Sequence, residues 1–115
     1  MKDKDIRDYL NDIIDAAVKI QEFTQGIISF DEFIKNDMLL SAVIRKFEII
    51  GEAIKKVPID VREKYNNIPW KNIAGARDRL IHSYDDIDYE ILWDTIINDI
   101  PQLKSDIEKI IKELY

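Results

Sequence analysis

Residues 75–84 combine the side chains that RNA cleavage needs when no metal ion takes part. The segment reads Gly-Ala-Arg-Asp-Arg-Leu-Ile-His-Ser-Tyr and contains His82, the single histidine of the chain. An imidazole titrates near neutral pH, and a guanidinium presents planar donors to phosphate oxygens. The 2′-hydroxyl of RNA can then attack its own phosphate while His82 moves a proton and Arg77 stabilises the developing charge. The alternative is structural, because a histidine near a helix end also stabilises the helix dipole.

The spacing of Arg77 and His82 limits how the two side chains can meet. Five residues correspond to about 500° of helical rotation, which places the two roughly 140° apart on a regular helix. Either the helix ends near His82, or the site lies in a cleft that reaches around it, as between two helices of a two-fold dimer. Asp78 lies four residues before His82 and on the same face. It either orients the imidazole or pairs with Arg79 or solvent.

The charge of the chain is unevenly distributed. The net charge of −6 argues against a protein that coats nucleic acid through its overall charge. Residues 55–82, however, hold seven basic and three acidic side chains, and the rest of the chain holds 10 basic and 20 acidic ones. Lys71 and Arg79 lie in this basic segment and are candidate substrate-groove residues. Two copies of the segment in a dimer would carry roughly +8; the other interpretation is that solvated helix faces simply differ in charge.

Apolar residues recur at helical spacing along most of the chain, which predicts an all-α fold. With only three glycines and three prolines, the chain has little material for the turns of a β protein. The expected helices cover residues 6–20, 38–57, 70–83 and 92–114, with a short stretch after Ser29 and a short helix over 60–65 as further candidates. These elements predict one domain over residues 1–115, folded as an antiparallel bundle of four to five helices.

Several residues are expected to set the helix boundaries. Asn36 or Asp37 should cap the helix over 38–57, Pro58 should end it, and Asp88 should cap the next one. Because the apolar phase continues past Pro101, we expect a kink or a brief break there rather than a reversal.

The expected helix over 38–57 has apolar residues on more than one face. In so short a chain, this predicts that its second face contacts another subunit. Arg45 and Glu52 lie nearly two turns apart on a similar face of this helix, where they either line the dimer groove, pair with Arg77, or form an ordinary exposed pair. Trp70 and Trp93 are expected in the core, although Trp70 could instead flank the groove.

Composition excludes some kinds of site. The chain has no cysteine, which excludes disulfides and thiolate metal sites. One histidine and scattered carboxylates form no compact ligand set, so we expect neither a metal nor a cofactor. The charged N-terminus lacks the apolar core of a signal peptide, and no window approaches 18 apolar residues. The expected location is the cytoplasm, away from membranes.

Three segments together resemble the HepT-like branch of the HEPN superfamily. The longest, residues 68–84, reads Ile-Pro-Trp-Lys-Asn-Ile-Ala-Gly-Ala-Arg-Asp-Arg-Leu-Ile-His-Ser-Tyr. The second, upstream, is Glu-Ile-Ile-Gly-Glu-Ala at 48–53, and the third, downstream, is Ile-Leu-Trp-Asp at 91–94 leading to Asp-Ile-Pro at 99–101. The family pattern, Arg, four residues, His, one residue, Tyr, falls on Arg77, His82 and Tyr84.

The resemblance implies a homodimeric ribonuclease that is the toxin of a toxin–antitoxin pair. Its partner would be a minimal nucleotidyltransferase antitoxin that transfers AMP to Tyr84. An added nucleotide would block a groove for RNA and repel the substrate. Two positions differ from the common pattern: Ala76 stands where Met is frequent, and Asp78 where Asn is frequent. The Asp78 carboxylate would either partly neutralise the charge of Arg77 or raise the proton affinity of His82.

Two other functions fit part of this pattern. One is a non-catalytic HEPN dimer that holds a nucleotide or a protein partner in the same groove. The other is a purely structural helical bundle.

Overall fold

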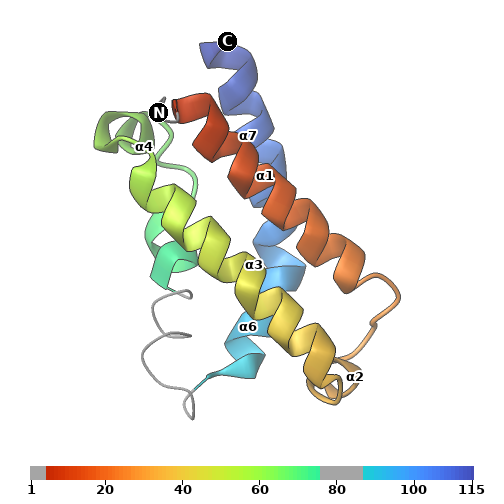
Figure 1. Cartoon of the computed structure of the whole chain (residues 1–115). Coiled ribbons are helices and arrows are strands. Elements are labelled where there is room, and N and C mark those ends of the chain that lie inside the picture. The colour runs from red at the N-terminus through yellow and green to blue at the C-terminus, as the bar shows by residue number, and fades with distance from the viewer. Residues whose placement is uncertain (1–4, 76–86) are drawn as a thin grey trace, which may run out of the picture.

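The apolar stripes of the sequence form helices whose apolar sides face one another (Figure 1). The computed structural model describes residues 5–75 and 87–115, and all the regular structure in these two ranges is helical. Residues 70–75 form a helical stretch, and the remaining helices are α1 (Ile6–Phe23), α2 (Phe30–Ile34), α3 (Asp37–Lys56), α4 (Ile59–Lys64), α6 (Tyr89–Asn98) and α7 (Ile100–Leu114). The all-α prediction is therefore confirmed.

Helix α1 begins at a capping box formed by two aspartates. The Asp8 backbone N–H donates to Asp5 Oδ1 at 3.1 Å, and the Asp5 backbone N–H donates to Asp8 Oδ2 at 3.3 Å. Both bonds satisfy donors that the first turn of a helix leaves free. Of the predicted apolar stripe, Leu10, Ile13, Ala17 and Ile20 are buried, and Ile6 and Ile14 are partly buried against the core.

Helix α3 confirms one of the two expected caps and weakens one argument for a dimer. Asn36 is the cap, since its Oδ1 accepts the Leu39 backbone N–H at 3.0 Å. The helix ends at Lys56, just before Val57 and Pro58. Most of its apolar residues are buried within the chain, whereas Ile44 and Ile49 are partly buried and Met38 is 85% exposed. Most of the apolar residues that suggested a subunit contact are therefore buried within the single chain, and contact of this helix with a second subunit stays a prediction.

Three helical columns make up the molecule (Figure 1). Helix α1 packs against both α3 and α7 and runs in the opposite direction to both. Helices α6 and α7 form one column that is interrupted at Asp99, and Pro101 lies in the first turn of α7, where its missing N–H costs nothing. The predicted brief break is confirmed. The described helices outnumber the four or five expected, because α2 and α4 are separate short helices and this break divides the last stripe.

One apolar core joins these columns. The rings of Phe33 and Trp93 lie 4.9 Å apart and tie α2 to α6. Trp70 is 6% exposed, and Trp93 is partly buried against the core. Both tryptophans therefore lie where the sequence predicted.

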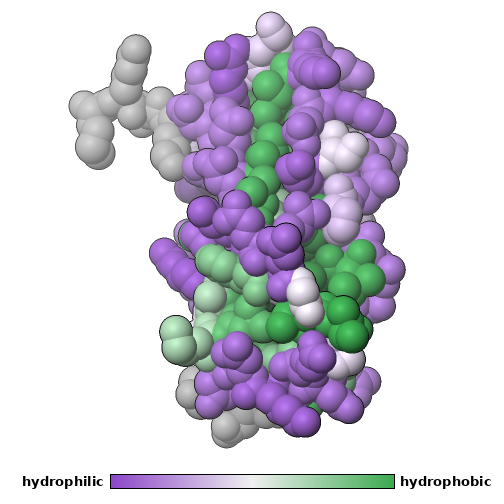
Figure 2. Space-filling view, turned by 90° about the vertical axis from the view of Figure 1, so that its right-hand side faces the viewer, coloured by the Kyte–Doolittle hydropathy of each residue, from purple (hydrophilic) through white to green (hydrophobic). Residues whose placement is uncertain are grey.

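Apolar side chains also reach the surface. Figure 2 shows an apolar area across the lower half of one face, and a narrower apolar line above it between two polar ridges. Large apolar side chains are exposed around the ends of α1, α2 and α6, and they include those of Phe23, Ile28, Ile34 and Ile97. Among the described helices, none has the length and hydropathy to cross a membrane.

Candidate active site

Five of the predicted site residues, Arg77, Asp78, Arg79, His82 and Tyr84, lie outside the described residues. The structure describes the chain on either side of this segment, and three predicted site residues elsewhere: Lys71, Arg45 and Glu52.

The residues that lead into this segment are anchored in the core. Ile68, Trp70 and Ile73 are all buried. The Trp70 backbone N–H donates to the Ile68 carbonyl at 2.8 Å, and the Ile73 N–H donates to the Pro69 carbonyl at 3.1 Å. Proline before the first helical residue suits a helix start, because no donor is lost there. Buried side chains therefore anchor the start of the helical stretch at 70–75 in the core.

The residues on the C-terminal side of the segment are anchored as well. Asp88 caps α6, as predicted, since its Oδ1 accepts the Ile91 backbone N–H at 3.1 Å. Leu92, one turn into α6, is buried. Core packing thus holds the chain on both sides of residues 76–86.

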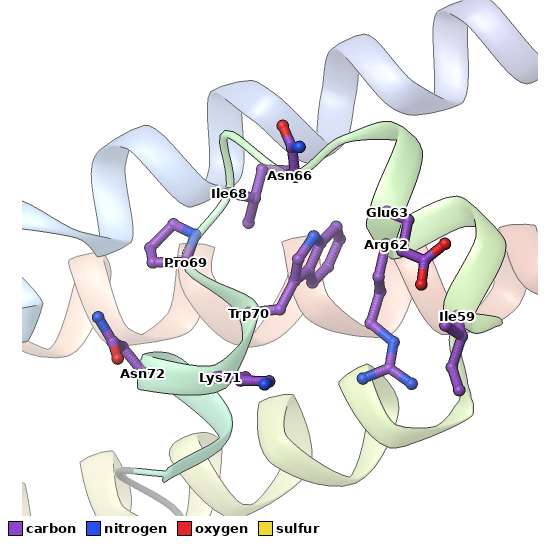
Figure 3. A pocket seen from close by; sticks show the side chains of 9 residues that line it. All are labelled: Ile59, Arg62, Glu63, Asn66, Ile68, Pro69, Trp70, Lys71 and Asn72. Carbon is purple, nitrogen blue, oxygen red and sulfur yellow. The ribbon is translucent and has the colours of Figure 1, made fainter.

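A pocket lies beside the entry to this segment (Figure 3). It encloses about 540 Å³ between α4 and the start of the helical stretch at 70–75. Its lining comprises Ile59, Arg62, Glu63, Asn66, Ile68, Pro69, Trp70, Lys71 and Asn72. The pocket therefore combines an apolar wall with two basic side chains and two carboxamides.

Two hydrogen bonds hold the shape of this pocket. Arg62 Nε donates to the Val57 carbonyl at 3.1 Å, and Trp70 Nε1 donates to the Tyr65 carbonyl at 3.1 Å. The first bond ties the guanidinium of Arg62 to Val57, the residue that follows α3. The second keeps the indole against the turn after α4 and satisfies the one polar group of a buried tryptophan.

The turn after α4 is also tied to α7. The Tyr65 hydroxyl donates to Glu113 Oε2 at 2.6 Å. This hydrogen bond raises the pKa of Tyr65 above its usual value, and desolvation and the negative charge of Glu113 act in the same direction. The back of the pocket is thereby linked to the C-terminal helix.

The structure separates the other predicted groove residues. Lys71 is exposed and lines the pocket. Arg45 Nη1 instead pairs with Glu48 Oε2 at 3.1 Å on α3, and its side chain is 62% exposed. Glu52 is exposed and lines a different hollow between α1 and α3, together with Tyr9 and Lys56. Lys71 is therefore the one described candidate that lies at the pocket.

Sequence reasoning missed Arg62 as a site residue. Arg62 was counted only in the positive charge of residues 55–82, because its spacing to Arg77 and His82 indicates no shared role. The signal that it carries is structural: the turn at 65–69 brings α4 back against residues 70–72.

The described residues hold no group of three or more His, Cys, Asp or Glu side chains arranged to bind a metal ion. The polar groups that line the pocket are the guanidinium of Arg62, the ammonium of Lys71, the carboxylate of Glu63 and the carboxamides of Asn66 and Asn72.

These features define a small all-α protein whose core holds the residues on both sides of 76–86, with a basic pocket at residues 68–72. The family description "Ribonuclease HepT-like" matches residues 13–110, which include 76–86. The chain belongs to the HepT-like ribonuclease family.

Relatives that align over nearly their whole length carry ribonuclease names. A "Putative RNase" of Methanocaldococcus jannaschii is 47% identical over 99% of this chain and 97% of its own length. A "Putative RNase" of Caldanaerobacter subterraneus is 43% identical over 93% of this chain and 95% of its own. "Probable ribonuclease HepT" of Thermococcus cleftensis is 45% identical over 92% of this chain and 96% of its own. No solved structure matches the chain significantly.

Proposed function

We propose that the protein is a metal-independent endoribonuclease and the toxin of a toxin–antitoxin pair, with Arg77 and His82 as its catalytic residues. The observation that carries this proposal is the family match over residues 13–110, because it includes the Arg77, His82 and Tyr84 pattern. The relatives named as ribonucleases support the choice of reaction.

The proposed reaction uses RNA as its own nucleophile. The 2′-oxygen forms a bond to the adjacent phosphorus, and the bond from phosphorus to the 5′-oxygen breaks. His82 moves the proton, which passes in effect from the 2′-hydroxyl to the leaving 5′-oxygen. The Arg77 guanidinium donates to the phosphate oxygens as charge builds on them. The products are a cyclic phosphate and a free 5′-hydroxyl.

The proposal includes a homodimer and an off-switch. Two copies of the basic segment facing one groove would attract RNA although the chain is acidic overall. AMP transfer to Tyr84 by a nucleotidyltransferase antitoxin would add bulk and negative charge to that groove. Support for both comes from the family resemblance and from the position of Tyr84 two residues after His82.

The test is cleavage of RNA by the purified protein with excess chelator present. His82→Ala and Arg77→Ala should each lower the rate about 10²- to 10⁴-fold. Lys19→Ala is the matched control, because it removes a cation that pairs with Glu22 on α1. Full activity in His82→Ala would show that the histidine is not catalytic, whereas no cleavage by the wild type would favour a non-catalytic binding module.

The off-switch has its own test. Incubation with the antitoxin and ATP should label the wild-type protein with AMP and stop cleavage. Tyr84→Phe should keep its cleavage activity and should resist the antitoxin. Labelling of Tyr84→Phe at the wild-type level would assign the modification to another residue.

A further inference from the structure

We propose that the pocket lined by Arg62, Lys71 and Trp70 is a subsite that holds one nucleotide of single-stranded RNA next to the cleavage site. This inference rests on the proposed function, since it assigns a substrate-positioning role beside the proposed catalytic pair. Neither Arg62 nor Lys71 is required to take part in the chemistry itself.

The position of the pocket is the first support. Lys71 and Asn72 lie on the helical stretch at 70–75 and line the pocket. Lys71 precedes Gly75 by one helical turn, a rise of about 6 Å, and Arg77 follows Gly75 by two residues in the sequence. An RNA strand with one phosphate at Arg77 therefore has a neighbouring nucleotide within reach of the pocket.

The apolar wall is the second support. Ile68 and Trp70 are buried and form the base of the pocket, whereas Pro69 is exposed and Ile59 is 64% exposed. About 540 Å³ is within the range of small-ligand pockets and suits one nucleotide rather than a helix of a partner protein. Unpaired bases commonly pack on apolar and planar side chains in RNA-binding proteins.

The basic groups are the third support. In Figure 3, Arg62 and Lys71 extend toward the same edge of the pocket. Arg62 Nε is fixed by the Val57 carbonyl, which leaves the terminal nitrogens of its fork to face a ligand. Among residues 5–75 and 87–115, no carboxylate forms an ion pair with Arg62 or Lys71. Two such cations suit one phosphate.

The remaining polar groups of the pocket can bind the edge of a nucleotide base, and one of them reduces the positive charge of the pocket. The carboxamides of Asn66 and Asn72 each offer a donor and an acceptor for the edge of a base. The carboxylate of Glu63 lies on the Ile59 side of the pocket in Figure 3. With two cations and one anion in its lining, the pocket has a small net positive charge, which suits a single phosphate.

The first experiment measures binding, so it does not depend on cleavage. A fluorescein-labelled, ten-nucleotide single-stranded RNA is titrated with full-length His82→Ala protein, and Lys71→Ala or Arg62→Gln is added to that background. Each should weaken binding about tenfold and lower the salt slope of the affinity by about one. The matched control is Lys64→Ala, which removes a neighbouring cation of α4 that does not line the pocket. Losses equal to that control would overturn the subsite.

The second variant pair tests the apolar wall without disturbing the core. Ile59→Asp places a carboxylate in the pocket, whereas Ile28→Asp places one at an isoleucine that is 85% exposed and outside it. Ile59→Asp should weaken RNA binding about tenfold or more, while Ile28→Asp changes it less than about twofold. Equal effects would show that the apolar wall does not contact RNA.

A series of RNAs, each with one base removed at a different position, tests the same pocket from the side of the ligand. Removal of the base should weaken binding to the protein at only one position.

Kinetics then distinguish the subsite from the chemistry. In the protein with His82 intact, Lys71→Ala should raise KM about tenfold and change kcat little, as expected for lost ground-state binding. If the wild type binds RNA through this pocket but does not cleave it, the subsite stands and the catalytic proposal fails. If the wild type cleaves and the pocket variants match their controls, the reverse holds. Loss of antitoxin binding alone would assign the pocket to that protein and overturn the subsite.

Discussion

At the scale of single residues, the same substitution at two glycines should have opposite effects. Gly26 follows α1 with φ at 84°, a conformation that costs a residue with a Cβ about 1 kcal/mol or more. Gly75 lies in a helical stretch, where alanine is preferred by about 1 kcal/mol. A Cβ at either position meets no atom within 4 Å, so backbone preference alone decides the sign.

We therefore expect Gly26→Ala to lower the free energy of unfolding by about 1 kcal/mol and Gly75→Ala to raise it by about 0.5–1 kcal/mol. Urea denaturation followed by circular dichroism measures both changes. A destabilised Gly75→Ala protein would mean that this glycine is needed for the chain that comes after it.

Residue types also set how much of the site the sequence could predict. Arg77 and His82 stand out because few other side chains stabilise a phosphate or titrate near pH 7. Lys71 was identified because it lies in the same basic segment. Arg62 was missed, and Arg45 and Glu52 were not brought to the pocket, because such roles depend on how α4 and α3 pack. Spacing along one helix carries no information about a turn that folds another helix beside it.

At the scale of elements, one hydrogen bond links the turn after α4 to α7 and should make that link sensitive to alkaline pH. The Tyr65 hydroxyl donates to Glu113 at 2.6 Å, and this bond raises the pKa of Tyr65. The pKa in the folded state is thus higher than in the unfolded state. The stabilisation is fully present below the usual tyrosine value of 10.0 and is lost as pH rises through the raised value.

Tyr65→Phe, which cannot donate this bond, should melt at a lower temperature than the wild type at pH 8. The difference should shrink steadily above pH 10.0. Melting temperatures between pH 8 and 11 measure it, and Tyr115→Phe is the control because its ring can still pack under Arg7. A difference that stays constant up to pH 11 would contradict the role of the Tyr65 proton.

Local signals predicted most elements correctly. Asn36 and Asp88 cap the helices that come after them, since short polar side chains before apolar stripes satisfy free backbone donors. Pro101 produced the expected break. For α3, the sequence predicted the apolar residues but not which neighbouring helix covers them. Helix α1 packs along α3, so the single chain buries residues that had been assigned to a subunit contact.

At the scale of the whole molecule, the net negative charge of the chain means that the proposed RNA binding depends on whether two chains assemble. The local charge of residues 55–82 is small against a net charge of −6, so one copy attracts RNA weakly. A dimer in which two such segments face one groove would double the positive charge there. Long-range electrostatic attraction of this kind weakens as the salt concentration rises. Exposed apolar side chains such as Phe23, Ile34 and Ile97 offer surface for a protein contact. Analytical ultracentrifugation should therefore show a dimer at micromolar concentration; a monomer would refute this part of the proposal.

The proposed dimer also allows the sharpest test of how Arg77 and His82 would meet. Their spacing of five residues separates them by about 140° on a regular helix, which favours a site that takes the arginine from one chain and the histidine from the other. An Arg77→Ala dimer and a His82→Ala dimer are each inactive under this arrangement. A mixed dimer, however, keeps one intact arginine and one intact histidine across the same groove.

Mixing the two inactive proteins should therefore restore cleavage. Random exchange of subunits makes about half of the dimers mixed, and each of these has one working site of two, so about a quarter of the wild-type rate should return. Native mass spectrometry measures the mixed fraction, and each variant incubated alone serves as the control. If mixed dimers form without any activity, Arg77 and His82 must act from the same chain. The 140° separation would then have to be closed within one chain, because both groups must still reach one phosphate.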